Sequence, residues 1–339
     1  VKDAGLWFGM GSEGTMTSAN DSYGAFVYGT YTITELKTEA TRSMKMYTNT
    51  FTIDTDGKVL DLGTVDNIPM SIRTTLVDVN EEHFTEVASS ITLTDHVAYK
   101  NLDTDKTYTL TGTLYIKDVE ALTELMTQTV DFTPAEKNGT QDVVFTFDAS
   151  DLAGKSVVAF EELSVNGEFC AEHKDKDDEN QTVTFPDIQT TARDNVTEDH
   201  VSNAADSVTI IDTVTYTGLK AGETYEITGT LMDAETGEAA LDDDGNAITA
   251  SKEFTAPTAD GNIDITFTFA GVSLAGKTLV AFEDISYEGR RYAVHADIND
   301  KNQTVYIPKI HTKALDANTG LNQVLADSNA TVVDTVTYT

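Results

Sequence analysis

The stretch ITLTDHVAYKNL (residues 91–102) recurs as VTIIDTVTYTGL (residues 208–219), and its central part recurs again in TVVDTVTYT (residues 331–339). In all three copies apolar and β-branched residues alternate with polar ones, which is the period of a β-strand with one buried face. A fixed internal repeat also sets the domain organisation, because each copy is one structural unit. The stretch therefore predicts an all-β chain with two complete repeats and the start of a third.

Two further blocks follow in the same order in both complete copies. YTLTGTL (108–114) matches YEITGTL (225–231), and DLAGKSVVAFEEL (151–163) matches SLAGKTLVAFEDI (273–285). Short strands of this kind, separated by turn residues, are typical of antiparallel β-sandwiches.

Two local departures from the repeat carry their own predictions. Asp95 and Asp212 are 117 residues apart, whereas Asp212 and Asp334 are 122 apart, so copy two contains five additional residues. We place them near DAETGEAALDDDGNA (233–247) and expect a hairpin or loop tip there. In VEALTELMTQ (119–128) the apolar residues lie at roughly helical spacing, which predicts a short helix in the first repeat.

The charge of the chain excludes two classes of partner. Lys and Arg number 22 against 57 Asp and Glu, a formal net charge of -35, which repels nucleic acid and anionic membrane surfaces. The single cysteine, Cys170, cannot form an intramolecular disulfide. Residues 1–10 have no basic stretch leading into an apolar one, so we expect any secretion signal to lie outside the chain and its ends to be cut from a longer protein.

An aspartate interrupts the apolar face of each repeated strand. Alternation puts Asp95, Asp212 and Asp334 on the side that faces the core. Burying a lone ionised carboxylate is costly, so each must be neutral, paired or hydrogen-bonded, and its pKa is a target of tuning.

A threonine and a glutamine enter the core side in the same way. Gln181 and Gln303 lie on the apolar face of the strand that closes each complete repeat. An I-x-T pattern before each repeat contains Thr74, Thr190 and Thr312, which precede the Asp of their own copy by 21, 22 and 22 residues. This Thr is present in all three copies, whereas the Thr that follows it in the first two copies is replaced by Lys313 in the third.

Two further residue types recur in register. Glu161 and Glu283 stand in the VAFE text, where we expect them to end a strand, and His173 and His295 lie eight residues before each Gln. A hydroxyl, an imidazole, two acids and an amide are the parts of an acyl transfer. The His can take the Thr proton if a carboxylate orients it, and a carboxyl kept protonated by burial can protonate departing ammonia. The product would be an ester between the first and last strands.

These motifs resemble the VaFE-repeat, Thr-Gln ester-bond domains of Gram-positive surface adhesins. The resemblance covers residues 68–339 and includes VAFE, the H-x-D-x-x-D-x-x-Q-T pattern from His295 to Thr304 and the I-x-T pattern. It implies esters between Thr74 and Gln181, assisted by Asp95, Glu161 and His173, and between Thr190 and Gln303, assisted by Asp212, Glu283 and His295. Thr312 and Asp334 would belong to a third domain whose Glu, His and Gln are missing. Which acid plays which part stays open.

The first 67 residues have a different text, with alternating strands at YGTYTITEL (28–36) and FTID (51–54). The pattern of Gly29, Tyr31 and Glu35 resembles part of a prealbumin-like sandwich of pilins and adhesins, in which such an acid lies beside a Lys-Asn isopeptide bond. Asn67 would be the Asn, but the Lys strand should precede residue 1 and Lys2 is a poor candidate for the Lys, so whether this module carries a bond stays open.

The fold class is therefore all-β, with tandem immunoglobulin-like or prealbumin-like antiparallel sandwiches. We divide the chain into a partial prealbumin-like sandwich (1–67), two ester-bond domains (68–187 and 188–309) and a truncated third (310–339).

Three other interpretations remain open. A buried Asp or Gln is commonly just a satisfied hydrogen-bonding group. The acidic loops 175–180 and 297–302 supply oxygen ligands at short spacing and could hold calcium, although they have no Gly at a turn position and no distant bidentate Glu. A hydrolase with a Thr-His-Asp site is the third, but its nucleophile would lie inward on a strand with no turn to expose it.

The function that follows is the structural stalk of a cell-wall-anchored, extracellular adhesin. We expect no cofactor and no metal, a monomeric rod, self-directed single-turnover chemistry instead of enzyme turnover, and a host surface or matrix ligand bound by other parts of the protein. The alternative is a calcium-binding or ligand-binding sandwich without crosslinks.

Overall fold

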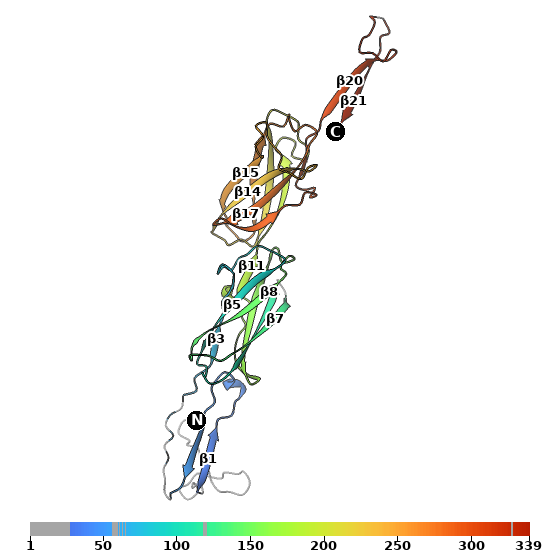
Figure 1. Cartoon of the computed structure of the whole chain (residues 1–339). Coiled ribbons are helices and arrows are strands. Elements are labelled where there is room, and N and C mark those ends of the chain that lie inside the picture. The colour runs from blue at the N-terminus through green and yellow to red at the C-terminus, as the bar shows by residue number, and fades with distance from the viewer. Residues whose placement is uncertain are drawn as a thin grey trace.

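The chain forms an extended rod. The computed structural model describes residues 28–55, 60, 62, 64, 66–117, 121–326 and 328–339. Two β-sandwiches lie end to end, with a two-stranded hairpin before the first and another after the second (Figure 1). We call the sandwich of β3–β11 domain 1, the sandwich of β12–β19 domain 2, and the described residues before β3 the N-terminal module.

Domain 1 consists of two antiparallel sheets. In the first, β5 (Ile91–Lys100) lies between β8 (Gly139–Phe147) and an interrupted strand made of β3 (Ser71–Arg73) and β4 (Leu76–Asp78). The second has the order β10-β9-β6-β7, with β11 also paired to β9; these strands are β6 (Tyr108–Lys117), β7 (Leu122–Phe132), β9 (Lys155–Val165), β10 (Glu168–His173) and β11 (Thr182–Phe185).

Domain 2 repeats this plan. Its first sheet has the order β12-β13-β16, from β12 (Asp187–Asp194), β13 (Val208–Thr217) and β16 (Gly261–Phe269). Its second has the order β15-β14-β17-β18, with β19 paired to β17; these are β14 (Thr224–Asp233), β15 (Thr249–Thr255), β17 (Thr278–Tyr287), β18 (Arg290–His295) and β19 (Thr304–Tyr306). The prediction of tandem antiparallel sandwiches is confirmed.

Isolated hairpins stand at both ends of the rod. Tyr31 of β1 (Gly29–Thr34) stacks on Phe51 of β2 (Thr48–Ile53) with the ring centroids 5.8 Å apart. At the other end β20 (Ile310–Asp316) pairs with β21 (Val332–Tyr338), and Thr312 lies opposite Val336. Thr190 lies opposite Val214 in β12 and β13 in the same way. The third copy therefore begins with the pairing that the second copy uses.

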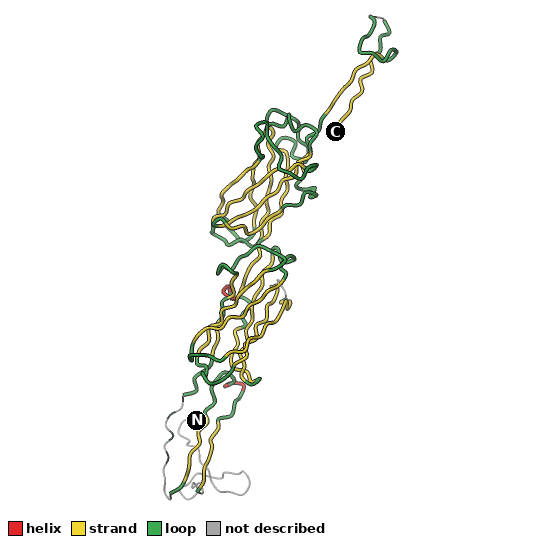
Figure 2. Tube along the Cα trace, in the orientation of Figure 1, coloured by secondary structure: helices red, strands yellow, loops and turns green. Residues whose placement is uncertain are grey.

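Helix is almost absent from the described residues, where it amounts to two three-residue turns, η1 (Glu39–Thr41) and η2 (Glu179–Gln181) (Figure 2). Neither has the length or the apolar content to cross a membrane.

The predicted helix at 119–128 is wrong. Its described residues from Leu122 onward belong to β7, which pairs with β6. A β-bulge at Leu125 sets Tyr115 opposite Glu124 and Leu114 opposite Met126. Because a bulge adds one residue to the strand, the partly buried apolar residues fall at intervals of three and four and imitate the spacing of a helix.

The other strand predictions hold, with one adjustment. The alternate residues of β5 from Leu93 to Tyr99 and of β13 from Val208 to Tyr216 are buried. The insertion at 233–247 forms a turn and a small hairpin held by bridges from Met232 to Ala239 and from Leu241 to Ala247. Glu161 and Glu283 lie inside their strands, which continue to Val165 and Tyr287, because β10 and β18 pair with those extensions.

A glycine in the middle of β6 and β14 leaves room in each core. Gly112 lies opposite Glu161, and Gly229 lies opposite Glu283. A Cβ on Gly112 would come within 2.6 Å of Glu161 Oε1, and a Cβ on Gly229 within 2.5 Å of Phe267 Cζ. A glycine inside a strand commonly marks such a close approach. These two glycines let the Glu and an aromatic ring share the same layer.

We therefore expect Gly112→Ala and Gly229→Ala each to destabilise its own domain by about 1–3 kcal/mol, since the packed core has no space for the methyl group. Gly29→Ala is the control, because its Cβ would make only ordinary contacts with Tyr31 at 3.8 Å or more. Denaturant unfolding of the three variants measures the effect. Unchanged midpoints for domains 1 and 2 would show that the cores rearrange freely around these positions.

Candidate functional site

Each sandwich brings the five predicted side chains to one place in its core. In domain 1 Thr74 lies in the gap between β3 and β4, where its N–H leaves the strand ladder and donates to His173 Nδ1 at 3.3 Å. Asp95 and Glu161 point inward from the centres of β5 and β9, and Gln181 ends the turn η2 just before β11. Thr74 is 4% exposed, and Asp95, Glu161 and Gln181 are completely buried. Domain 2 also buries Thr190, Asp212, Glu283 and Gln303. There Thr190 lies within the continuous strand β12, and His295 Nδ1 has no hydrogen-bond partner among the described residues.

The Thr hydroxyl and the Gln amide are in direct contact in both domains. Gln181 Nε2 donates to Thr74 Oγ1 at 3.0 Å, and Gln303 Nε2 donates to Thr190 Oγ1 at 2.7 Å. In domain 1 the same amide nitrogen also donates to the carbonyl oxygens of Ala159 at 2.8 Å and His173 at 3.2 Å. The first and last parts of each domain, 107 and 113 residues apart in sequence, are thus joined through one pair of side chains.

The histidine lies between the Thr hydroxyl and an acidic loop. His173 Nδ1 is 3.4 Å from Thr74 Oγ1, and its Nε2 is 3.6 Å from Asp178 Oδ2. In domain 2 His295 Nε2 is 3.1 Å from Asp300 Oδ2. Because Nδ1 accepts from Thr74, the proton of a neutral ring belongs on Nε2, where the Asp orients it. Burial lowers the pKa of His173, which favours the neutral ring. A neutral ring has a free lone pair and can therefore act as a base near neutral pH.

Two carboxyl groups face each other behind the threonine. The carboxyl oxygens of Asp95 and Glu161 are buried and meet no hydrogen-bond donor among the described residues, so one proton shared between them is the favourable arrangement. Burial, followed by the hydrogen bond and charge of Asp95, raises the pKa of Glu161 to about 10, while burial raises the pKa of Asp95 to about 6. Glu161 is therefore a protonated acid at neutral pH.

Domain 2 has the same pair and shows where the protonated acid lies. Burial, followed by Asp212, raises the pKa of Glu283 to about 10, and burial raises the pKa of Asp212 as well. Glu283 Oε2 is 3.0 Å from Gln303 Nε2 and 3.2 Å from Thr190 Oγ1. The acid thus touches both the nitrogen that would leave and the oxygen that would attack.

Sequence reasoning did not assign two groups of acids that the structure places. Asp178 and Asp300 belong to a sequence motif but were given no role, and in the structure each lies beside the His ring of its domain. Asp78, Asp194 and Asp316, each four residues after the repeated Thr, accept backbone N–H groups of the loop that follows. The recurrence of an Asp at the same offset in all three copies was the available signal.

The acidic loops use their carboxylates internally. Asp175 Oδ1 accepts the N–H of Asp177, and Asp178 Oδ1 accepts that of Asn180. Asp297 and Asp300 make the equivalent bonds to Asn299 and Asn302 in domain 2. These oxygens shape the turn that presents the His and the Gln.

The remnants outside the two domains are arranged differently. Thr312 and Asp334 lie on β20 and β21 but are exposed, since the described residues supply no opposite sheet to cover them. In the N-terminal module Asn67 Nδ2 donates to Glu35 Oε1 at 2.7 Å, as expected for an Asn beside its acid. Lys2 lies outside the described residues.

The fold and the repeated Thr-Gln contact define a class: tandem β-sandwiches, each with a buried acyl-transfer set between its ends. Comparison with families agrees. The profile of the family described as "T-Q ester bond containing domain" matches residues 70–185, 186–307 and 308–339. The chain belongs to this family.

Comparison with single proteins adds little. No curated protein matches the chain. A solved bacterial adhesin from Mobiluncus mulieris, described as containing intramolecular disulfide, isopeptide and ester bond cross-links, is 15% identical over 79% of this chain and 92% of its own, with a TM-score of 0.32. Red sea bream transglutaminase is 11% identical over 70% of this chain and 31% of its own, with a TM-score of 0.27. Scores this low carry no argument, and the family rests on the profile match.

The protonated glutamates predict an unusual dependence of stability on pH. In Thr74→Ala/Thr190→Ala, which keeps both acid pairs, Glu161 and Glu283 hold a proton in the folded state up to a pKa of about 10 and release it near the ordinary value of 4.5 when unfolded. The folded state then binds more protons between these values, so the free energy of unfolding falls as pH rises through this window, by at most about 1.4 kcal/mol per pH unit for each group.

Denaturant unfolding of that variant from acid to mildly alkaline pH measures this slope. Adding Glu161→Gln/Glu283→Gln should flatten it, because the amides do not titrate. A slope of the opposite sign in the Thr variant would mean that the glutamates are ionised in the core.

Proposed function

We propose that each complete domain closes a Thr-Gln ester on itself and that the chain is the stalk of a bacterial surface adhesin. The observation that carries the proposal is the buried contact between the Gln amide and the Thr hydroxyl, which both domains make. In domain 1 the His ring lies beside this contact, and in domain 2 the Glu carboxyl does. The chemistry occurs once per domain, so the chain is a substrate of its own reaction and not an enzyme with turnover.

The proposed reaction begins at the threonine. His173 Nδ1 takes the hydroxyl proton while Asp178 holds the ring, and Thr74 Oγ1 attacks Gln181 Cδ. A protonated Glu161 supports the charge that develops on the Gln. The contact replaces a bimolecular encounter by an intramolecular one, which contributes roughly 7 to 11 kcal/mol to lowering the barrier.

The second step releases ammonia. The bond from Gln Cδ to Nε2 breaks, the new bond from Cδ to Thr Oγ1 remains, and the nitrogen leaves with one added proton as NH3. Glu283 lies 3.0 Å from the departing nitrogen in domain 2 and is the proposed proton donor; the proton on His295 restores it. Burial of the product keeps water from hydrolysing the ester.

The ester would change how the domain carries tension. Gln181 and Thr190 are nine residues apart, as are Gln303 and Thr312. A pull along the rod would pass from Thr74 through the ester to Gln181, along nine residues to Thr190 and through the second ester. Closing a loop of about a hundred residues also removes unfolded-state entropy worth roughly 4 to 5 kcal/mol, if the treatment of disulfides applies to esters.

The finer parts of the proposal follow from this role. A stalk of this kind belongs outside the cell, anchored to a Gram-positive cell wall, as a monomeric rod that needs no cofactor. A host surface or matrix ligand would bind other parts of the protein. The acidic, Thr-rich composition with one cysteine suits an exposed rod that gains durability without disulfides.

Intact mass under denaturing conditions tests the ester. We expect the measured mass of the parent chain to be lower than the mass calculated from its sequence by two ammonia molecules. In Thr74→Ala and in Thr190→Ala the deficit should be one ammonia molecule. The exposed Thr312 of the third copy should contribute no deficit. Thr75→Ala and Thr191→Ala are matched controls and should keep both. A folded chain of full calculated mass would contradict the proposal.

Stability provides the second test of the stalk. Thr74→Ala and Thr190→Ala should each keep the fold but lower the free energy of unfolding of its domain by about 4 kcal/mol, chiefly through the unfolded state. Thermal unfolding should show one domain of each variant melting earlier, and circular dichroism should remain unchanged. Equal melting in the variants and their neighbouring-Thr controls would mean that the crosslink does not stabilise the domain.

A further inference from the structure

The same hairpin lies at both junctions along the rod. It joins β9 to β10 in domain 1 and β17 to β18 in domain 2, and each turn has two successive residues with positive φ: Asn166 (50°) and Gly167 (79°), then Glu288 (50°) and Gly289 (76°). Such pairs are typical of two-residue type I′ turns, which hold a hairpin rigidly. We call these two loops the junction hairpins, because each touches the module that precedes its own domain.

The junction hairpin of domain 1 presents acids to cations. Lys37 of the N-terminal module donates to Phe169 O at 2.8 Å and lies 3.8 Å from Glu168. Arg42 pairs with Glu172 at 2.6 Å and stacks 4.2 Å from the Phe169 ring centroid. The module therefore contributes positive charge and the hairpin contributes negative charge.

The junction hairpin of domain 2 has the opposite signs. Arg290 Nη1 lies 3.6 Å from Asp78 Oδ2, and Arg291 Nε donates to Glu86 Oε2 at 2.8 Å. Arg290 is 122 residues from Glu168 and occupies the same place in its hairpin. At the first junction the hairpin is acidic and its neighbour is basic, whereas at the second junction the hairpin is basic and its neighbour is acidic.

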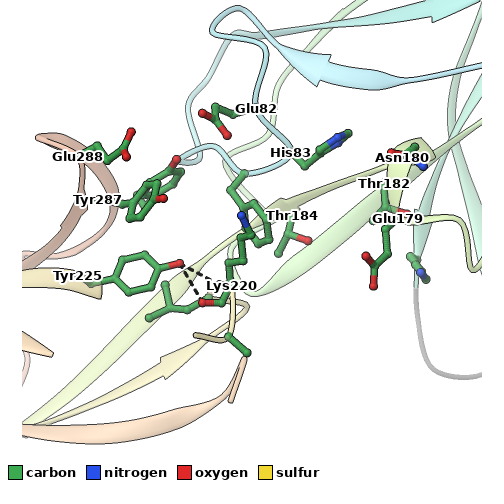
Figure 3. Close-up of a pocket in the computed structure, with 15 residues that line it drawn as sticks. Glu82, His83, Glu179, Asn180, Thr182, Thr184, Lys220, Tyr225, Tyr287 and Glu288 are labelled. Carbon is green, nitrogen blue, oxygen red and sulfur yellow. Dashed lines mark hydrogen bonds between the residues drawn. The ribbon is translucent and has the colours of Figure 1, made fainter. Parts of the chain in front are cut away.

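Apolar packing sits beside these ion pairs. Phe84, on the loop after β4, packs against the core of domain 2. The loop and the hairpin border a cleft of about 630 Å³, with Glu82 and His83 contributed by domain 1 and Tyr287 and Glu288 by domain 2 (Figure 3). The ion pairs and the ring therefore resist bending together with the short link from β11 to β12, where Thr184 and Pro186 lie against Gly218.

We propose that the junction hairpins are docking elements that fix the direction of each domain on the one before it, and that their opposite charges specify which neighbour fits. If the hairpin of domain 1 met the loop that the hairpin of domain 2 meets, Glu168 would face Asp78, and Phe169 would stand where Arg291 pairs with Glu86. Like charges at a contact penalise a wrong partner, and specific interfaces use this repulsion together with attraction to the right one. This goes beyond the ester, which acts inside a domain and does not orient it.

The two ion pairs differ in burial and in geometry. The side chain of Asp78 is 3% exposed, so its attraction to Arg290 is little screened. Arg291 and Glu86 are 52% and 39% exposed, which is the setting of a weak surface pair. The Arg290 pair is buried on the Asp78 side but has no hydrogen bond, whereas the Arg291 pair is exposed but hydrogen-bonded at 2.8 Å, so the junction depends on both arginines.

Pulsed electron paramagnetic resonance tests the proposal on the full chain. Spin labels on Val144→Cys in β8 and Thr266→Cys in β16 occupy equivalent exposed positions of the two domains, 122 residues apart, while Cys170 is buried. We expect a narrow distance distribution in the parent protein and a broad, shifted one in Arg290→Glu/Arg291→Glu. Lys309→Glu/Lys313→Glu makes the same change of charge on exposed residues beyond domain 2 and should leave the distribution narrow.

A charge exchange provides the rescue. Arg291→Glu alone should broaden the distribution, and Glu86→Arg/Arg291→Glu should narrow it again. Raising salt to about 1 M, where the Debye length is roughly 3 Å, should broaden the parent distribution partly without any substitution. An unchanged distribution in Arg290→Glu/Arg291→Glu, or no narrowing in the exchanged pair, would overturn the proposal. Intact masses of the same samples report the esters separately, so the two proposals can fail independently.

Discussion

The pair of carboxyl groups in the middle of each sandwich is the constraint on which the other features depend. Two ionised carboxylates cannot share an apolar core, so one must keep its proton. Burial, followed by the neighbouring Asp, raises the pKa of Glu161 and of Glu283. The neighbours follow from that choice. A glycine on the adjacent strand makes space, the ring of Phe145 or Phe267 comes close to that glycine, and the Thr and Gln complete the layer. Buried acids contribute little to the stability of a core by themselves. The proposed ester at that place would therefore add stability that the core alone does not supply.

Much of the fold and most of the site could be predicted because the two complete repeats of the chain can be aligned with each other. A single buried Asp is ambiguous, but Asp95 and Asp212 recur in register with Thr, Glu, His and Gln, and the structure brings each set together. Alternation also gave the buried faces of β5 and β13 directly. The failure at β7 has a specific cause, since the bulge at Leu125 breaks the two-residue period and no pattern rule anticipates a bulge.

What alternation could not predict depends on contacts between distant segments. The acid that orients each His lies five residues after it, in a loop whose turn is shaped by its own carboxylates, and no strand period describes such a loop. The junctions are a similar case. Glu168 and Arg290 look like ordinary surface variation until the neighbouring module is in place, because the meaning of an exposed charge lies in the side chain that it faces.

The short link from Gln181 to Thr190 has a topological consequence. With both esters formed, the chain is no longer a line but two covalent rings joined by a bridge of eight residues, 182–189. A cleaved peptide bond inside a ring, anywhere from 74 to 181, leaves the rod in one piece, because the two ends remain connected the other way round. Between the two rings the bridge is the only path, and it lies in β11 and β12, where Val183, Phe185 and Ile188 are buried. The stretch at which one cut would separate the two domains therefore contains several buried residues.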